Sequence, residues 1–297
     1  MPSAEMAALF ARIRTAVPAR EFSVESHRDR ARRGEALTVP DEGTEVEEVR
    51  IGDQPAEWVR AAGSARRRAV VFLHHGAFIA GSRTSLRVLG HRLALACGVD
   101  VLAPDYRLAP EHPFPAAVED AVAAYRWVLE RGFAPGRVAL AGASAGGGIA
   151  AAAMIAVRDA GLPRPAAGLL LCPMADATLT SAAMVSTAQT EPVDSRDIVR
   201  QAVALYLAGV EPTHPWASPA RADLAGLPPL HVEAAGADRL MDDARLLVER
   251  ARAAGVRATL EVTEGAVHNF AQLAADIPES RHAIARMAAH LDRFLDS

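Results

Sequence analysis

Ser144 is the residue of this sequence whose setting best suits a nucleophile. It is the centre of residues 142–146 (Gly-Ala-Ser-Ala-Gly), after the apolar run 138–141 and at the start of a helical pattern over 145–160. G-x-S-x-G between a strand and a helix is typical of a sharp turn that lifts the serine hydroxyl above a sheet edge. The alternative is a glycine-rich helix start that binds phosphate or only packs. The spacing up to Gly147 does not match a dinucleotide-binding motif, because the second glycine is missing.

A second segment could supply backbone hydrogen-bond donors. Residues 74–78 (His-His-Gly-Ala-Phe) follow the apolar run 69–73, and the small residues Gly76 and Ala77 allow the chain to approach a substrate closely. Such N–H groups stabilise the negative charge that develops on a carbonyl oxygen. The alternative is a metal pair at His74 and His75. Adjacent residues of an extended segment point to opposite faces and make poor co-ligands, so we expect no metal.

A serine hydroxyl needs a general base, and the base needs an acid that fixes its tautomer. Asp238 follows the apolar run 230–234, and His268 follows the apolar run 259–262. Both therefore lie beyond the ends of strands, at the sheet edge where Ser144 is expected. The order serine, acid, histidine along the chain is far more specific than any one of these motifs.

The elements that must position these residues alternate along the chain. From about Val46 onward, short apolar runs predict strands at residues 69–73, 99–103, 138–141, 167–171, 230–234 and 259–262. Helical patterns occur at residues 86–96, 116–130, 145–160, 243–254 and 280–295. Strand and helix in repeated alternation predict an α/β fold with a mostly parallel sheet flanked by helices. Asp242 and Asp243 fit the N-terminus of the fourth of these helices, where the helix dipole favours acids.

Two further helical patterns fall outside this alternation. Apolar residues recur on one helical face from Met6 to Val17, and a second pattern covers residues 198–207 after a start signal at Asp194 or Ser195. Together they predict a helical lid.

Composition excludes several classes of function. All 32 basic residues are arginine, so a phosphate-binding lysine loop, a pyridoxal Schiff base and a Ser–Lys dyad are impossible. The net charge of −4 argues against nucleic acid as a partner. The arginine-rich stretches 28–33 and 66–68 are expected on solvated surfaces.

The expected location is the cytoplasm, with no membrane insertion. The N-terminus lacks an export signal, and no uninterrupted apolar run reaches the ~18 residues that span a bilayer. Cys97 and Cys172 are too few for a disulfide scaffold, and their apolar surroundings predict buried thiols in a reducing compartment.

Taken together, the motifs resemble those of the bacterial hormone-sensitive-lipase-like esterases, the family IV lipolytic enzymes. Members carry H-G-G-G-F, G-D-S-A-G-G, D-P-L-x-D-E and H-G-F, and the similar segments here are residues 74–78, 142–147, 238–243 and 268–270. Residues 106–115 (Tyr-Arg-Leu-Ala-Pro-Glu-His-Pro-Phe-Pro) resemble a further family signature. The resemblance covers nearly the whole chain.

The resemblance implies an α/β-hydrolase fold and hydrolysis of carboxylic esters without a cofactor. Carried over by position, Ser144 is the nucleophile, His268 the base and Asp238 the orienting acid. Three backbone N–H groups would form the oxyanion hole, those of Gly76, Ala77 and Ala145.

The resemblance also implies a division of the chain and a class of substrate. A catalytic core of residues 46–176 and 217–297 would carry a cap of residues 1–45 and 177–216. The expected substrate is a small-molecule ester of short to medium chain length, with lactones as a further class. The alternatives are a non-catalytic small-molecule receptor on the same fold, and an amidase or acyltransferase that uses the same triad. Relatives often dimerise through an edge strand, which would be residues 259–262 here, so a homodimer is one expected state.

The departures from the family pattern that matter most fall at four positions. His75 and Ala77 replace glycines, so the oxyanion loop is bulkier and its backbone more restricted. Ala143 replaces the acid before the nucleophile, and Asn269 replaces the glycine after the histidine.

Overall fold

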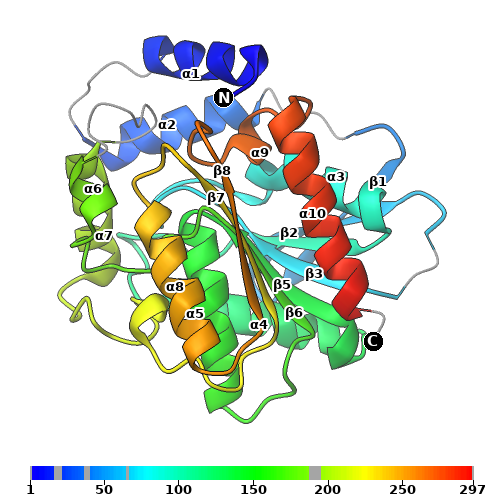
Figure 1. Cartoon of the computed structure of the whole chain (residues 1–297). Helices are drawn as coiled ribbons and strands as arrows, with labels where there is room; N and C mark the ends of the chain where they lie inside the picture. Colours follow the sequence, from blue (N-terminus) through cyan, green and yellow to red (C-terminus); the bar gives the residue numbers. More distant parts are fainter. Residues whose placement is uncertain (1, 17–21, 37–40, 65–66, 187–194, 296–297) are drawn as a thin grey trace.

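The computed structural model describes residues 2–16, 22–36, 41–64, 67–186 and 195–295. Its centre is an eight-stranded sheet in the order β1-β2-β4-β3-β5-β6-β7-β8, with helices on both faces (Figure 1). The strands are β1 (Thr44–Ile51), β2 (Gln54–Ala61), β3 (Ala69–Leu73), β4 (Asp100–Pro104), β5 (Val138–Ala143), β6 (Ala167–Leu171), β7 (Leu230–Ala235) and β8 (Ala258–Thr263). Strand β2 pairs antiparallel with β1 and β4, and the remaining pairs are parallel. The predicted mostly parallel sheet is confirmed.

The hairpin of β1 and β2 is the part of the sheet that the sequence did not specify. These strands turn at Gly52, whose backbone is left-handed at φ 58°, and most of β1 is exposed on both faces. Strand β1 therefore lacks the apolar run by which the six strands β3 to β8 were predicted.

The sheet buries apolar residues on both faces. Val71 and Leu73 of β3 face one core, which includes residues of α4 (Ala116–Glu130), α5 (Ala145–Asp159) and α8 (Met241–Ala253). Their neighbours Val70 and Phe72 face a second core, with α3 (Arg87–Cys97) and α10 (Pro278–Leu295). This alternation is the period of two that a strand imposes. It explains why the inner strands are continuous apolar runs.

Four helices lie at the end of the sheet where the parallel strands finish (Figure 1). They are α1 (Ala4–Ala16), α2 (Val24–Glu35), α6 (Ala182–Ser186) and α7 (Arg196–Leu207). Met6 and Leu9 of α1 are buried, as the helical pattern predicted, whereas Val17 lies outside the described residues. Ser195 caps α7 through its side chain; Asp194 is outside the described residues. The division into a core and a cap stays a prediction.

The shorter elements complete the chain between these helices and strands. They are α9 (Phe270–Leu273) and the 3₁₀ turns η1 (Arg83–Leu86), η2 (Pro135–Arg137) and η4 (Pro219–Arg221). No helix of the described residues is long and apolar enough to cross a bilayer. Strand β8 ends the sheet order, and dimerisation through residues 259–262 stays a prediction.

The arginine-rich stretches are not simply solvated surface, so that expectation was wrong for two residues. The side chain of Arg68 is fully buried, where it forms an ion pair with Asp292 (2.8 Å) and donates to the Cys97 carbonyl. Arg28, a residue of α2, is partly buried against the loop after β3. Both guanidinium groups use several of their five donors, which a charge count along the sequence cannot reveal.

Candidate active site

Ser144 lies in the turn between β5 and α5, as predicted. Its backbone, at φ 55° and ψ −121°, lies outside the regions that are allowed for most residues, and its N–H donates to the Leu171 carbonyl at 2.9 Å. A non-glycine residue in such a conformation is strained and persists only where its surroundings fix it. The turn holds the serine side chain at the start of α5, where the helix dipole favours negative charge.

Gly142 and Gly146 make this turn possible because neighbouring backbone lies against them. A Cβ at position 146 would overlap the carbonyl oxygens of Leu73 and His74, and one at position 142 would overlap the Gly146 carbonyl. The end of β3 and the first turn of α5 therefore pack directly together. This contact brings the loop that follows β3 beside Ser144.

Replacing Gly146 with alanine is expected to destabilise the fold by about 1–3 kcal/mol, because the added methyl group forces the β3 and α5 backbones apart. Urea denaturation measures the change. Gly136→Ala is the matched control, since no atom lies within 4 Å of a Cβ at that position. Equal stability of the two variants would contradict the packing described here.

The structure brings His268 and Asp238 to Ser144 in a continuous line of hydrogen bonds. His268 Nε2 lies 2.8 Å from Ser144 Oγ, and His268 Nδ1 lies 2.7 Å from Asp238 Oδ2. The other oxygen of Asp238 accepts the Leu240 N–H at 2.9 Å, which fixes the carboxylate plane. Asp238 follows β7 and His268 follows β8, so the ends of neighbouring parallel strands position both residues.

The electrostatics of His268 reflect two opposing effects. Burial disfavours the charged imidazole, but the charge of Asp238 and its hydrogen bond outweigh burial and raise the pKa of His268 well above its ordinary value. An imidazole beside a carboxylate accepts a proton readily. This is the electrostatic requirement for a general base.

The loop after β3 carries the predicted oxyanion donors. Gly76 has φ 128° and Ala77 has φ 53°, so alanine occupies a left-handed conformation that costs an L-residue roughly 1–2 kcal/mol. Within the described part of the chain, none of three backbone N–H groups donates an internal hydrogen bond: those of Gly76, Ala77 and Ala145. Burial, with repulsion from His74 and His268, lowers the pKa of His75 to about 4, so the extra imidazole in this loop is neutral.

Residues that the sequence analysis gave no role support this loop. Tyr106 stacks on His74 with ring centroids 4.0 Å apart and donates its hydroxyl to the His74 carbonyl at 2.9 Å. Arg28 donates to the Ile79 carbonyl at 2.9 Å and pairs with Glu111, an interaction that lowers the pKa of Glu111 to about 2. The segment 106–115, first noted only as a signature, thus supports the loop from outside.

Both predicted helix-start acids also accept hydrogen bonds from backbone N–H groups of another segment. Asp243 is in the first turn of α8, as expected, but its buried carboxylate accepts the N–H groups of Ala175 and Asp176, both at 3.0 Å. Asp242 accepts the Ala183 N–H at 2.7 Å. These carboxylates connect α8 to the segment that leads into α6.

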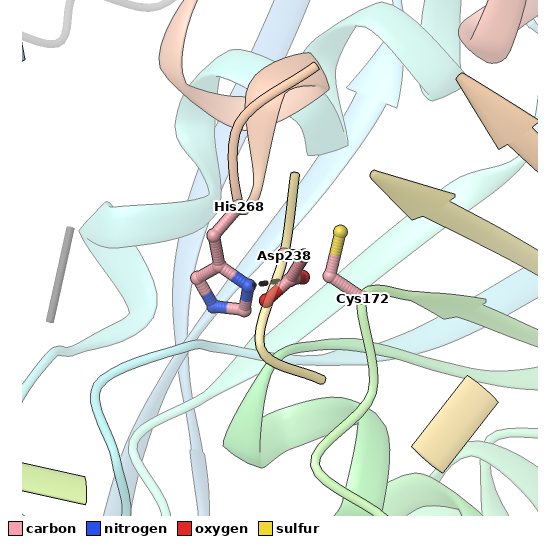
Figure 2. A group of neighbouring side chains, drawn as sticks. All are labelled: Cys172, Asp238 and His268. Atoms are coloured by element: carbon pink, nitrogen blue, oxygen red, sulfur yellow. Dashed lines mark hydrogen bonds and ion pairs between the residues drawn. The ribbon is translucent and has the colours of Figure 1, made fainter. Parts of the chain in front are cut away.

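Cys172 has a position that its sequence context did not reveal. Both cysteines are buried, as predicted, but Cys172 comes directly after β6 and its thiol lies beside Asp238 and His268 (Figure 2). Its backbone is left-handed at φ 44°. Asn269, at φ 56°, is also left-handed, which explains a glycine at that position in the family pattern, because asparagine and glycine tolerate this conformation best.

Comparison with known proteins agrees with this geometry. Residues 70–272 match the model of a family described as having the alpha/beta hydrolase fold. An acetyl-hydrolase of Streptomyces hygroscopicus is 46% identical over 244 residues, which are 82% of this chain and 81% of that protein. The carboxylesterase NlhH of Mycobacterium tuberculosis is 35% identical over 237 residues, 76% of this chain and 73% of that protein.

Solved structures of esterases superpose on nearly the whole chain. An esterase from the bacterial hormone-sensitive lipase family superposes with a TM-score of 0.94 at 40% identity, covering 99% of both chains. An esterase/lipase from an uncultured bacterium superposes with a TM-score of 0.94 at 35% identity, covering 99% of this chain and all of that one. The chain belongs to the α/β-hydrolase family and is a carboxylic ester hydrolase of the hormone-sensitive-lipase type.

Proposed function

We propose that this protein is a serine carboxylesterase that forms an acyl-enzyme on Ser144, with His268 as the base and Asp238 as the orienting acid. The observation that carries the proposal is the line of two hydrogen bonds, 2.8 Å and 2.7 Å long, from the serine hydroxyl to the carboxylate. A hydroxyl, an imidazole and a carboxylate in this order can move one proton and stabilise the imidazolium that forms.

In the acylation step, Ser144 Oγ attacks the ester carbonyl while His268 Nε2 takes the hydroxyl proton. The tetrahedral oxygen then accepts from the three free backbone N–H groups, those of Gly76, Ala77 and Ala145. His268 returns its proton to the leaving alcohol. Water then attacks the acyl-enzyme while His268 takes a proton from it. His268 returns this proton to Ser144 Oγ, which releases the carboxylic acid and restores Ser144.

The substrate in this proposal is an ester with a short to medium acyl chain, with lactones included as cyclic esters. The relative from Streptomyces hygroscopicus is named an acetyl-hydrolase. The protein EstE5, whose structure superposes on this chain, was soaked with p-nitrophenyl butyrate in the crystal. Both names support a short acyl group. Tyr206 of α7 stacks on Phe78 of the oxyanion loop, with ring centroids 3.9 Å apart, so the proposed cap contacts the loop that would hold the carbonyl oxygen.

The test is a series of p-nitrophenyl esters from acetate to palmitate, with a lactone and a matched anilide. We expect kcat/KM for the best short ester to exceed that for palmitate by about tenfold or more, because each methylene that the site cannot accommodate costs binding free energy. Anilide hydrolysis at a comparable kcat/KM would point to an amidase instead. Transfer of the acyl group to an added alcohol as the main product would point to an acyltransferase. Tight binding of esters without turnover would indicate a receptor.

A further inference from the structure

Three side chains of metal-binding type meet behind the catalytic imidazole. Cys172, Asp238 and His268 each offer one ligand atom, and these atoms all lie within 4.8 Å of one another. They follow the neighbouring parallel strands β6, β7 and β8. Figure 2 shows Cys172 on the side of the imidazole that faces Asp238.

We propose that this cluster is an inhibitory site for Zn²⁺, in which a cation binds Cys172 Sγ, Asp238 Oδ2 and His268 Nδ1. The inference rests on the proposed function for its effect on activity, but not for the binding itself. Thiolate sulfur, imidazole nitrogen and carboxylate oxygen are the three ligand types that Zn²⁺ uses in proteins. In the part of the chain that the structure describes, no other group of three or more such side chains lies this close together.

The charges of the cluster favour a divalent cation. A thiolate and a carboxylate balance Zn²⁺, so the complex is neutral and escapes most of the cost of burying charge. Burial first, and the nearby charge of Asp238 second, raise the pKa of Cys172 to about 11. The thiol is therefore protonated in the metal-free protein, and a coordinated thiol loses that proton outright. Binding therefore releases one proton from Cys172 for each cation bound.

The geometry needs only a small rearrangement. Tetrahedral zinc bonds of about 2.0–2.3 Å place ligand atoms roughly 3.3–3.7 Å apart, whereas Nδ1 and Oδ2 are 2.7 Å apart. A small rotation of the imidazole opens this pair. The His268 side chain is 12% exposed while that of Asp238 is only 3% exposed, so His268 is the more accessible of these two ligands.

Metal at this site would stop the proton transfer that the reaction needs. A neutral imidazole carries one ring proton, and a cation on Nδ1 displaces that proton to Nε2. Nε2 then donates to Ser144 Oγ and can no longer accept the hydroxyl proton. Because Ser144 and the oxyanion donors keep their places, Zn²⁺ is expected to lower kcat and to leave KM nearly unchanged.

The experiment combines inhibition with a binding measurement that needs no activity. Ester hydrolysis is measured after preincubation with zinc sulfate for the wild type, Cys172→Ala, Cys172→Ser and the matched control Cys97→Ala, each relative to its own metal-free rate. We expect half-inhibition at the same zinc concentration for the wild type and Cys97→Ala. Both Cys172 variants should need at least about tenfold more zinc, the scale on which lost metal interactions act. Mg²⁺, which prefers oxygen ligands, should not inhibit.

The binding arm uses Co²⁺ with the Ser144→Ala protein, in which a cobalt–thiolate absorption band should appear and should be absent when Cys172 is also replaced. The same zinc sensitivity in the wild type and both Cys172 variants would overturn the proposal, and so would the lack of a cobalt–thiolate band. A cobalt band in a protein whose wild type hydrolyses no ester would overturn the proposed function and leave the metal site standing.

Discussion

Ser144→Ala is expected to reduce kcat for p-nitrophenyl acetate by about 10⁴–10⁶-fold, because it removes the only oxygen that the proposed mechanism joins to the acyl group. His268 and Asp238 keep their hydrogen bond in this variant, and the three free N–H groups stay in place. Residual turnover above the uncatalysed rate would come from substrate binding and the oxyanion donors alone.

A folding defect must be separated from this loss. Ser144 Oγ has one hydrogen-bond partner in the described chain, His268, so the variant should unfold at nearly the wild-type urea concentration. Ser64→Ala is the matched control: it also removes one serine hydrogen bond, to the Gly98 carbonyl, but before β3, away from the triad. It should retain full activity. Wild-type activity in Ser144→Ala would defeat the assignment of the nucleophile.

Asp238→Asn is expected to reduce kcat by about 10⁴-fold with little change in fold. The amide oxygen can keep the bond from the Leu240 N–H that Asp238 now accepts, which leaves the amide NH₂ facing His268 Nδ1. An NH₂ group donates, so Nδ1 must accept and the ring proton moves to Nε2. The imidazole then has no acceptor for the serine proton.

The pH dependence of kcat/KM is a second test of the Asp238→Asn substitution. The Asp238 charge outweighs burial and raises the pKa of His268, and activity requires the neutral imidazole. Activity of the wild type therefore falls as pH decreases through that pKa. Removal of the charge lowers the pKa, so the acid limb of kcat/KM should move to lower pH in Asp238→Asn. An acid limb at the wild-type position would contradict the electrostatic role given to Asp238.

The sequence was a good guide wherever a local pattern sufficed. Buried parallel strands are continuous apolar runs, so β3 and β6 were predicted at their observed bounds. The proximity of Ser144, Asp238 and His268 was predicted from chain order, because each residue comes after a strand and parallel strands end at one edge. Their contacts at 2.8 Å and 2.7 Å are the geometry that this order implied.

What the sequence did not reveal depends on contacts between distant segments. Arg28 reaches the Ile79 carbonyl across 51 residues, and Tyr106 reaches the His74 carbonyl across 32; no local period marks either residue. Cys172 looked like any buried thiol, since its neighbours along the chain are apolar. Its proximity to Asp238 and His268 arises only when β6, β7 and β8 lie side by side.

The most direct test of an acyl-enzyme on Ser144 is mass spectrometry of the protein quenched with acid during turnover of p-nitrophenyl acetate. The proposed acyl-enzyme mechanism predicts one acetyl group per chain, carried on the peptide that contains Ser144, and no such adduct in Ser144→Ala. An acetyl group on a different residue during turnover, or full turnover with no covalent adduct in a rapid-quench series that captures the first catalytic cycle, would contradict it.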